Sequence, residues 1–362
     1  MKIMDITIYY HKYSGGIKTY INEKVKWLSE KKIDHVVVIP GKVYKKYKVR
    51  NSTFYELPSL ILLGGYRYFL DLKDIENIIH LEKPDILELG GTYYIFYFLK
   101  KSNFFLAAFY HSDVLREIEL LQLPKILKKK ILNFLLEKCL KKADLLLVPS
   151  TRYQEELKQL GFKQIMRAPL GVDVKLFNPY KMDINLKKSF GIPPQKFLLL
   201  YVGRLSPEKG IKLLLEAFQR LDPTKYHLFI VGKGPLEFLI KIYQNKLSNL
   251  THLPYLGVRE DLAKLYASSD LFVSASSFET FGLSFLEAQA SGLPVCAFDL
   301  GLETQIIKEI LAREKTPESL TNNIVKACHL VNPELRNYLH KKVQENFSWD
   351  KTFASLLEAY GV

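Results

Sequence analysis

The sequence has few cysteines and no long apolar runs, and both features limit the classes of protein to which it can belong. Its 362 residues include three cysteines, Cys139, Cys296 and Cys328, which are widely spaced and odd in number. They form neither a disulfide framework nor a metal-ligand pattern, which favours a reducing, cytosolic environment. No apolar run approaches the ~20 residues that span a bilayer, and polar residues interrupt the N-terminus too early for a signal peptide.

Two common signatures of nucleotide and metal binding are also missing. Gly15 and Gly16 follow the first expected strand but do not complete a G-x-G-x-x-G motif, and no acid ends the next strand to bind an adenosine ribose. A dinucleotide cofactor is therefore disfavoured. No Asp-x-Asp pair is present to hold a metal–diphosphate complex. The sequence predicts neither a cofactor nor a metal site.

Positive charge is concentrated in the first half of the chain. Residues 1–170 carry 29 Lys and Arg against 18 Asp and Glu, whereas residues 171–362 carry 23 against 20. A basic half favours an anionic partner, namely a membrane surface, a nucleic acid or a phosphorylated substrate. No nucleic-acid-binding module is recognisable, which disfavours that class. A lysine-rich surface, as in thermophiles, is the alternative, although it explains the asymmetry poorly.

Both halves of the chain alternate short apolar runs with helical patterns. A chain of 362 residues exceeds the usual size of one core, so two domains are expected. Continuous apolar strands between helices predict buried parallel sheets, and hence two doubly wound α/β domains. Strands are expected at Ile3–Tyr9, Val36–Ile39, Ile86–Leu89, Leu106–Phe109, Leu145–Val148, Phe197–Val202, His227–Val231, Leu271–Val273 and Pro294–Phe298. Expected helices include Ile17–Glu30, Leu123–Lys142, Ile211–Leu221 and Leu283–Ser291.

The joint between the domains is expected near Ala168–Asp173, where proline and glycine interrupt both periodicities. The first domain is then residues 1–168 and the second is residues 169–346. The segment 347–362 has a helical pattern of its own and predicts a separate closing element.

A loop and the helix after it in the second domain are the most informative stretch. Glu279 lies on a loop that follows an apolar strand, and Glu287 lies within the next helix. Between them, Phe281, Gly282 and Leu283 open the helix, whose first N–H groups are unpaired and suit an anion. An anion site flanked by two carboxylates that accept hydroxyl hydrogen bonds fits a nucleotide-sugar. Two solvated acids on a surface loop are the alternative.

Arg204 and Lys209 lie in a glycine-containing turn between a strand and a helix of the same domain. Arginine offers a planar fork and lysine a mobile charge, so together they suit a diphosphate. Such residues are more often solvated when they stand alone, but the anion-binding loop beside Glu279 favours binding. The turn Gly232–Pro235 is as readily a tight βα turn as a ligand contact.

The first domain offers two candidates and two basic segments. Ser14-Gly15-Gly16 follows the first strand, where backbone can approach phosphate. His111 ends another strand and would point into the crevice between the domains, although a structural hydrogen-bonding role is equally common there. The segment Gly41–Arg50 is basic, aromatic and loop-like, and Leu123–Lys142 predicts a basic amphipathic helix. Packing of that helix on the sheet is favoured over membrane contact.

Taken in order, these residues resemble the pattern of retaining glycosyltransferases of family 4, which have the GT-B fold. The set comprises Gly15-Gly16, His111, the strand from Ala143 to Ser150, Pro169–Asp173, Gly203-Arg204, Lys209-Gly210, Gly232, Gly234 and the Glu279–Glu287 pair. The resemblance implies two Rossmann-like domains whose parallel sheets face a central cleft. The N-terminal domain would bind the acceptor, the C-terminal domain would bind a nucleotide-sugar donor, and the last helix would cross back to the N-terminal domain.

The resemblance implies donor-binding roles in the C-terminal domain. Arg204 and Lys209 would hold the diphosphate. The backbone of Phe281, Gly282 and Leu283 would reach the distal phosphate and the sugar. Such enzymes need no metal, and retention is thought to proceed by front-face attack.

The resemblance also implies roles nearer the reacting sugar. Glu279 would contact sugar hydroxyls in catalysis, and Glu287 would hold the ribose. Gly16, with Gly15 before it, would close over the phosphates. His111 would lie near an outer hydroxyl of the transferred sugar and act in catalysis.

The sequence therefore predicts a cytosolic, retaining, metal-independent hexosyltransferase that uses a UDP- or GDP-hexose. The expected acceptor is lipid-linked or a growing polysaccharide at the inner face of the cell membrane, with the anionic membrane surface as a partner. A transferase for a soluble sugar or sugar phosphate and a non-catalytic nucleotide-sugar-binding subunit of a synthase are the alternatives. After Gly301-Leu302-Glu303, the segment Ile306–Pro317 is shorter than the corresponding segment of family members and lacks glycine, so the sugar stays unassigned.

Overall fold

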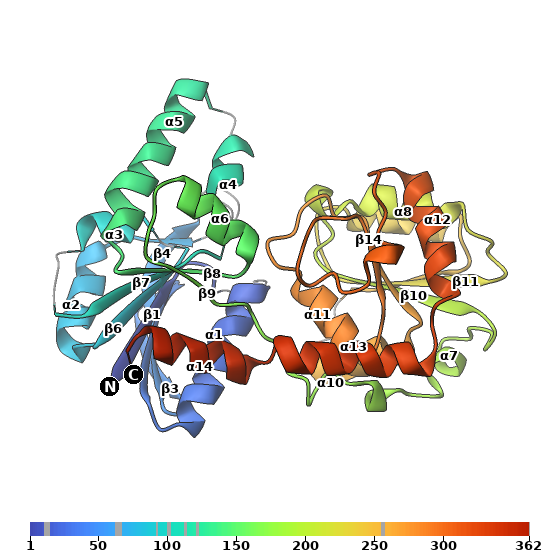
Figure 1. The fold of residues 1–362 in the computed structure, drawn as a ribbon, viewed down its shortest axis with the longest axis horizontal. Helices are drawn as coiled ribbons and strands as arrows, with labels where there is room; N and C mark the ends of the chain where they lie inside the picture. Colours follow the sequence, from blue (N-terminus) through green and yellow to red (C-terminus); the bar gives the residue numbers. More distant parts are fainter. Residues whose placement is uncertain are drawn as a thin grey trace. The chain divides into compact units, whose positions relative to one another are not determined.

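The computed structural model describes residues 1–10, 15–61, 67–91, 93–99, 103–111, 114–120, 123–254 and 258–361. The chain forms two compact units, each built on one β-sheet (Figure 1). The N-terminal unit comprises Met1–Leu170 and Trp349–Val362, and the C-terminal unit comprises Gly171–Ser348. The last helix therefore belongs to the same unit as the beginning of the chain.

The N-terminal unit contains a nine-stranded, largely parallel sheet. Its strand order is β3-β4-β2-β1-β6-β7-β8-β9, and β5 pairs with β4. β3 and β5 run antiparallel to β4, and the remaining pairings are parallel. The strands are β1 (Lys2–Thr7), β2 (Asp34–Gly41), β3 (Lys45–Val49), β4 (Ser52–Ile61), β5 (Arg67–Phe69), β6 (Ile86–Gly90), β7 (Phe105–Phe109), β8 (Leu145–Val148) and β9 (Ile165–Arg167).

Helices cover both faces of this sheet, because successive side chains of each strand point to opposite faces. Met4 and Ile6 of β1 point into an apolar core, whereas Asp5 between them points to the opposite face and contacts α1. One face carries α1 (Gly16–Glu30) and α14 (Trp349–Ala359). The other carries α2 (Leu72–Glu82), α3 (Ile95–Phe98), α4 (Val114–Leu120), α5 (Lys125–Asn133) and α6 (Thr151–Gln159).

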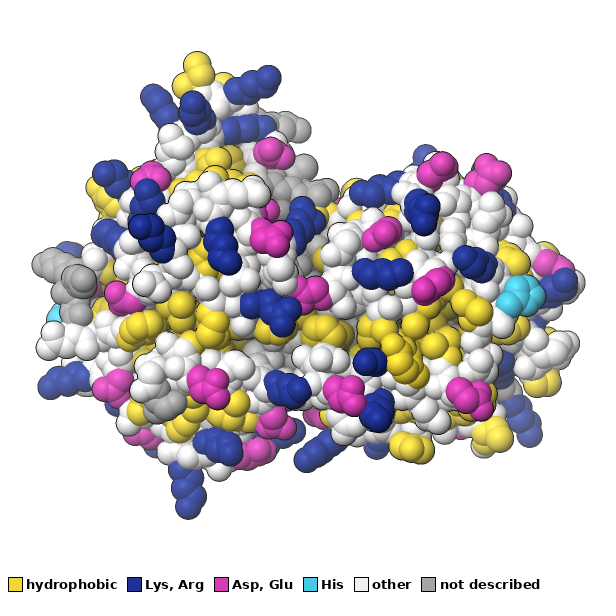
Figure 2. All heavy atoms as spheres, viewed as in Figure 1, with side chains coloured by type: hydrophobic (Ala, Val, Ile, Leu, Met, Phe, Trp, Pro, Cys, Tyr) yellow, Lys and Arg dark blue, Asp and Glu magenta, His cyan; other side chains and the backbone are white. Residues whose placement is uncertain are grey.

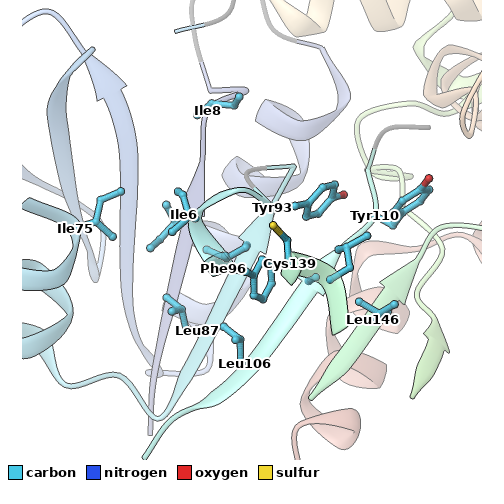
Figure 3. Packing of buried hydrophobic residues seen from close by; sticks show 14 of the residues in the cluster. Ile6, Ile8, Ile75, Leu87, Tyr93, Phe96, Leu106, Tyr110, Cys139 and Leu146 are labelled. Carbon is cyan, nitrogen blue, oxygen red and sulfur yellow. The ribbon is translucent and has the colours of Figure 1, made fainter. Parts of the chain in front are cut away.

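The apolar core lies on the face that carries α2, α3 and α6 (Figure 3). Ile6 and Leu87 reach it from neighbouring strands, and Phe96 reaches it from α3. Cys139 points into the same core, and burial raises the pKa of its thiol to about 11. A buried, protonated thiol of this kind is chemically inert.

The opposite face buries charged groups under α1. The Lys24 ammonium lies 2.8 Å from Asp5 Oδ1 and 2.7 Å from Glu88 Oε2, and all three side chains are almost completely buried. His35 Nε2 lies 2.6 Å from the second Asp5 oxygen, and its Nδ1 lies 2.8 Å from Ser52 Oγ. Asp5, Lys24, His35 and Glu88 form what is called below the buried ionic cluster.

Two tyrosine hydroxyls complete this cluster through Glu88. Tyr20 donates to Glu88 Oε1 at 2.9 Å, and Tyr360 donates to Glu88 Oε2 at 2.5 Å. Burial raises the pKa of Glu88 to about 6 although Lys24 opposes the shift. Burial also acts to raise the pKa of Asp5, but Lys24 and His35 outweigh it and hold that pKa below its usual range.

The C-terminal unit is a smaller doubly wound fold with an entirely parallel sheet. Its strand order is β12-β11-β10-β13-β14. The strands are β10 (Phe197–Val202), β11 (Tyr226–Val231), β12 (Leu250–Leu253), β13 (Leu271–Ser274) and β14 (Val295–Ala297). The helices are α7 (Leu186–Ser189), α8 (Ile211–Gln219), α9 (Glu237–Gln244), α10 (Arg259–Ser268), α11 (Leu283–Ala290), α12 (Pro317–Cys328) and α13 (Pro333–Asn346). The order reverses between β10 and β13, which is where ligands bind in open α/β sheets.

The predicted doubly wound α/β architecture is confirmed, but one local prediction is wrong. The basic segment Gly41–Arg50 is not loop-like, because Lys45–Val49 forms the exposed edge strand β3. The predicted helix Leu123–Lys142 is confirmed as a helical run from Lys125 to Lys142, which is α-helical to Asn133 and then continues as a π-helical and a 3₁₀ turn. Ile131 and Leu132 at the end of α5 pack against the core without being fully buried, whereas Leu136, Cys139 and Leu140 of the second part are buried in it.

Among the described residues, none of the helices has both the length and the apolar character that crossing a bilayer requires.

Replacing Lys24 with alanine should lower the free energy of unfolding of the N-terminal unit by about 3–5 kcal/mol, because Asp5 and Glu88 would stay buried without their cation. Both tryptophans of the chain, Trp27 and Trp349, lie in this unit, so urea unfolding followed by tryptophan fluorescence reports on it. The control is Lys141→Ala, which removes an exposed ion pair with Glu137 and should change little. Equal effects of the two substitutions would contradict a structural role for the cluster.

Candidate functional site

The candidate site of the C-terminal unit lies at one edge of its sheet. All five strands run parallel, so their carboxyl ends and the loops that follow them meet at the same edge. β10 and β13, on either side of the point where the strand order reverses, are followed by the loops that carry Arg204, Lys209 and Glu279. The fold therefore brings together loops that lie far apart in the sequence.

Lys209 and Glu279 form a direct ion pair at this edge. Lys209 Nζ lies 2.6 Å from Glu279 Oε1, and the two side chains retain 26% and 13% of their exposure. Both members of the pair are thus partly exposed to solvent. A diphosphate that reached Lys209 would compete with Glu279 for the ammonium, which would free the carboxylate to accept hydrogen bonds from hydroxyl groups.

Arg204 lies in the same turn and is exposed. Its backbone carbonyl accepts a hydrogen bond of 3.0 Å from the hydroxyl of buried Tyr201, which holds the turn in place. Within the described part of the chain its guanidinium makes no ion pair. The turn thus presents two cationic side chains, one paired and one exposed.

Two glycines near the site are required by close packing. Gly210 has φ +65°, and a Cβ there would lie 2.0 Å from the carbonyl oxygen of Ala275. Gly232 has φ +150°, and a Cβ there would lie 1.9 Å from the carbonyl oxygen of Gly203. Gly232 therefore has a structural reason to be glycine, which favours the tight-turn interpretation of Gly232–Pro235.

The N-terminus of α11 carries the predicted anion site. Gly282, with φ +82°, precedes the helix, and the amides of Leu283 and Ser284 donate to no acceptor within the described residues. Phe281 is buried, and its carbonyl accepts a hydrogen bond of 2.7 Å from Thr304 Oγ1. The loop is thus held by a residue from the segment after β14.

That segment is the part of the sequence that departs from the family pattern, and the structure shows how it is anchored. The buried amide of Gln289 donates to the carbonyls of Thr304 and Phe285 at 2.7 and 2.9 Å, and its oxygen accepts from the amide of Ile306 at 3.2 Å. Sequence reasoning missed Thr304 and Gln289. A glutamine among the apolar residues of the buried side of α11 was the signal that could have indicated Gln289.

Glu287 lies on α11 in a partly buried position. The hydroxyl of Tyr266 donates to Glu287 Oε2 at 3.1 Å. Burial raises the pKa of Glu287 to about 7, although Arg259 and Tyr266 act to lower it. The carboxyl group is therefore divided between its acid and carboxylate forms near neutral pH. Tyr266 and Arg259 were not singled out from the sequence.

The candidates of the N-terminal unit lie at the carboxyl ends of its strands. Gly15 precedes α1, Gly16 is its first residue, and Ser14 lies outside the described residues. His111 follows β7, is 8% exposed, and its Nδ1 has no hydrogen-bond partner among the described residues. Burial lowers the pKa of His111 to about 3, with Lys24 adding to the shift and Asp5 opposing it, so the imidazole is neutral at physiological pH.

Two family models match successive parts of the chain. One described as "Glycosyltransferase Family 4" matches residues 14–176, and one described as "Glycosyl transferases group 1" matches residues 183–346. The chain belongs to the family 4 glycosyltransferases.

Curated relatives carry glycosyltransferase names. The chain is 23% identical over 371 residues to the GDP-mannose-dependent alpha-(1-6)-phosphatidylinositol dimannoside mannosyltransferase of Mycobacterium tuberculosis, an alignment that covers all of this chain and 96% of that protein. It is 38% identical over 163 residues to the GDP-mannose-dependent alpha-mannosyltransferase of Corynebacterium glutamicum, which covers 45% of this chain and 38% of that protein. The predicted enzyme class, a hexosyltransferase of this family, is confirmed.

Solved structures confirm the GT-B fold. Sucrose-phosphate synthase from Thermosynechococcus elongatus aligns with a TM-score of 0.81 at 20% identity, over 99% of this chain and 98% of that chain. HepE of Anabaena, solved in complex with UDP and glucose, aligns with a TM-score of 0.74 at 16% identity, over 100% and 99% of the two chains. The roles of individual residues stay predictions.

Replacing Gly210 with alanine should destabilise the glycosyltransferase more than replacing Gly191, which has the same φ of +65° but no atom within 4 Å of the place where a Cβ would lie. Both substitutions carry the cost of the left-handed backbone, about 1–2 kcal/mol. Gly210→Ala should cost a further ~1–3 kcal/mol, because the Ala275 carbonyl must move. Urea unfolding followed by circular dichroism measures the difference. Equal losses would show that the close approach of the two turns is unimportant.

Proposed function

We propose that this glycosyltransferase moves a hexose from a nucleotide-sugar to its acceptor with retention of configuration and without a metal ion. The observation that supports this most directly is the Lys209–Glu279 ion pair, which joins the loops after β10 and β13. It combines a cation for phosphate with a carboxylate for sugar hydroxyls. The unpaired amides at the start of α11 supply further donors in the same unit.

In the proposed donor complex, Arg204 and Lys209 hold the diphosphate. The backbone of Phe281, Gly282 and Leu283 reaches the distal phosphate and the sugar. Thr304 and Gln289 support this backbone through the hydrogen bonds described above.

The remaining proposed contacts surround the sugar and the ribose. Glu279 accepts hydrogen bonds from sugar hydroxyls, and Glu287 accepts them from the ribose. Gly15 and Gly16 leave room for backbone to approach the phosphates. His111, neutral and with Nδ1 unpartnered among the described residues, hydrogen-bonds the transferred sugar.

The proposed reaction breaks the bond between the sugar carbon and the diphosphate oxygen and forms one from that carbon to the acceptor oxygen on the same face. The acceptor proton passes to the departing phosphate. Negative charge grows on the leaving group while the sugar becomes oxocarbenium-like. Two cations and helix amides stabilise that charge, so neither a side-chain nucleophile nor a metal ion is required.

GDP-mannose is the first donor to test, because the Mycobacterium and Corynebacterium relatives are named for it. UDP-hexoses are next, since the structurally similar HepE was solved with UDP. The proposed acceptor is lipid-linked or a polysaccharide, and the mycobacterial relative's name includes a phosphatidylinositol dimannoside. A soluble sugar or sugar phosphate is the alternative acceptor.

We further propose that the enzyme is cytoplasmic and docks peripherally on an anionic membrane. Figure 2 shows lysine and arginine side chains beside apolar atoms at the end of the N-terminal unit formed by α5. Ile126 and Leu127 of this helix are 74% and 42% exposed. Strand β3 is exposed along its whole length and carries three lysines. Both surfaces combine cationic and apolar groups, as interfacial segments do.

Arg204→Ala and Lys209→Ala should each lower kcat/KM by about 30-fold or more, because each removes a charged partner of the diphosphate. Activity is measured with GDP-mannose and UDP-hexoses in the presence of EDTA, where the wild type should remain active. Lys225→Ala is the control, since this exposed lysine precedes β11 at the opposite edge of the sheet. Unchanged turnover in both site variants, or loss of wild-type activity in EDTA restored by Mg²⁺, would refute the donor site.

Donor affinity should rise with pH if Glu287 binds the ribose. The carboxylate accepts hydroxyl hydrogen bonds through both oxygens, whereas the acid form has turned one oxygen into a donor, and a pKa of about 7 leaves little carboxylate at pH 6. The affinity for GDP or UDP should therefore increase by up to about tenfold between pH 6 and pH 8. Calorimetric titration measures it, and Glu287→Gln should remove the pH dependence. A pH dependence that persists in this variant would assign it to another group.

The wild-type enzyme should sediment with phosphatidylglycerol vesicles but not with phosphatidylcholine vesicles. Each lysine near an anionic surface contributes about 1 kcal/mol, and the Debye length falls from ~10 Å at 0.1 M salt to ~3 Å at 1 M, so binding should weaken with salt. Glutamine at Lys128, Lys129 and Lys130, compared with glutamine at Lys45, Lys46 and Lys48, distinguishes α5 from β3. If the wild type does not bind at low salt, the soluble acceptor becomes the better proposal.

A further inference from the structure

We infer that Tyr20 is a positioning residue for His111, and that the buried ionic cluster under α1 holds Tyr20 in place. The inference rests on the role proposed for His111 in sugar transfer. It concerns a residue of α1 that is completely buried and so has no surface of its own for a ligand.

Three neighbours determine how the imidazole of His111 lies. Its ring is stacked on Phe109, with centroids 3.9 Å apart and planes 3° from parallel. Tyr20 meets it edge to face, with centroids 5.1 Å apart and planes at 64°. A Cβ added to Gly90 would lie 3.3 Å from His111 Cδ2, so the absence of a side chain there makes room for the ring.

Packing has to orient this ring, because Nδ1 of His111 is buried and has no hydrogen-bond partner within the described part of the chain. An imidazole that was hydrogen-bonded to a carboxylate would keep its orientation without packing from neighbouring rings. Here a small displacement of Tyr20 would let the ring turn. In the proposed complex the imidazole would then lose its orientation toward the sugar.

Tyr20 is itself fixed from two sides. Its hydroxyl donates to Glu88 Oε1 at 2.9 Å, and Glu88 also binds Lys24 and Tyr360. Its ring contacts Trp349 and Phe353 of α14, with centroids 6.2 and 5.6 Å away. The C-terminal helix and the cluster thus act on His111 through Tyr20.

The first experiment compares Tyr20→Phe, which keeps the ring but loses its bond to Glu88, with Tyr20→Leu, which loses the aromatic edge. Tyr20→Phe should lower kcat about three- to tenfold and Tyr20→Leu about 10- to 100-fold, with donor Kd unchanged, because small errors of position cost rate rather than binding. Tyr55→Phe is the matched control. Tyr55 is equally buried in the same unit and its hydroxyl donates to Glu82 at 2.5 Å, far from His111 in the sheet.

If the Tyr20 variants fail to fold, a variant that leaves Tyr20 intact still tests the inference. Gly90→Ala places a methyl group against the imidazole at a position whose φ is compatible with alanine, and it should lower kcat as Tyr20→Leu does. In the His111→Ala background neither substitution should lower kcat further, because residues that act through one group are not additive. A further loss in that background would show that Tyr20 acts by another route and would overturn the inference.

The imidazole signals of His111 test positioning without activity. They are assigned in ¹H–¹³C spectra of histidine-labelled enzyme as those missing in His111→Ala. They should shift or broaden in Tyr20→Leu and Gly90→Ala but not in Tyr55→Phe, and unchanged signals in both test variants would overturn the inference. If these signals respond but His111→Ala turns over like the wild type, the role proposed for His111 fails while the positioning stands.

Discussion

The parallel direction of all five strands in the C-terminal unit is the constraint on which the proposed donor site depends. It places every strand-to-helix loop at one edge, and the reversal of strand order sets β10 beside β13. Lys209 and Glu279, 70 residues apart in sequence, meet for this reason. Helix α11 begins at the same edge, with two amides that have no acceptor among the described residues. Cation, carboxylate and helix terminus are thus consequences of one topology.

In the N-terminal unit, a set of charged side chains buried beneath α1 connects separate elements of the fold. The free energy of removing the charges of Asp5, Lys24 and Glu88 from water offsets much of their electrostatic attraction. The cluster is therefore weak evidence for added stability. Its geometric effect is clearer. Glu88 connects β6 to α1 through Lys24 and Tyr20, and to the end of the chain through Tyr360. Helix α1 and Tyr360, which follows α14, are therefore tied to the same carboxylate.

Much of the fold and the outline of the site could be predicted from the sequence, because those features depend on local pattern. Continuous apolar runs predicted the parallel strands, and turns with glycine or charge marked their ends. The support of the site was not predicted. Thr304, Gln289 and Tyr266 act through hydrogen bonds to the backbone or to Glu287, and polar residues of these types carry no distinctive spacing. Strand β3 was missed because an exposed edge strand of three lysines, one tyrosine and one valine has no apolar period.

The sequence by itself determined the enzyme class, since the order of glycines, cations and acids along the chain is the signature of family 4. It also determined the two α/β units, because the apolar periodicity of each strand and helix is visible in its own short stretch of sequence. Only the tertiary structure decided which candidates touch. It paired Lys209 with Glu279, buried His111 against Tyr20, and turned Asp5 toward Lys24. Contacts of this kind join residues on different strands and helices, and they depend on sheet order and on the direction of each side chain, which no local pattern contains.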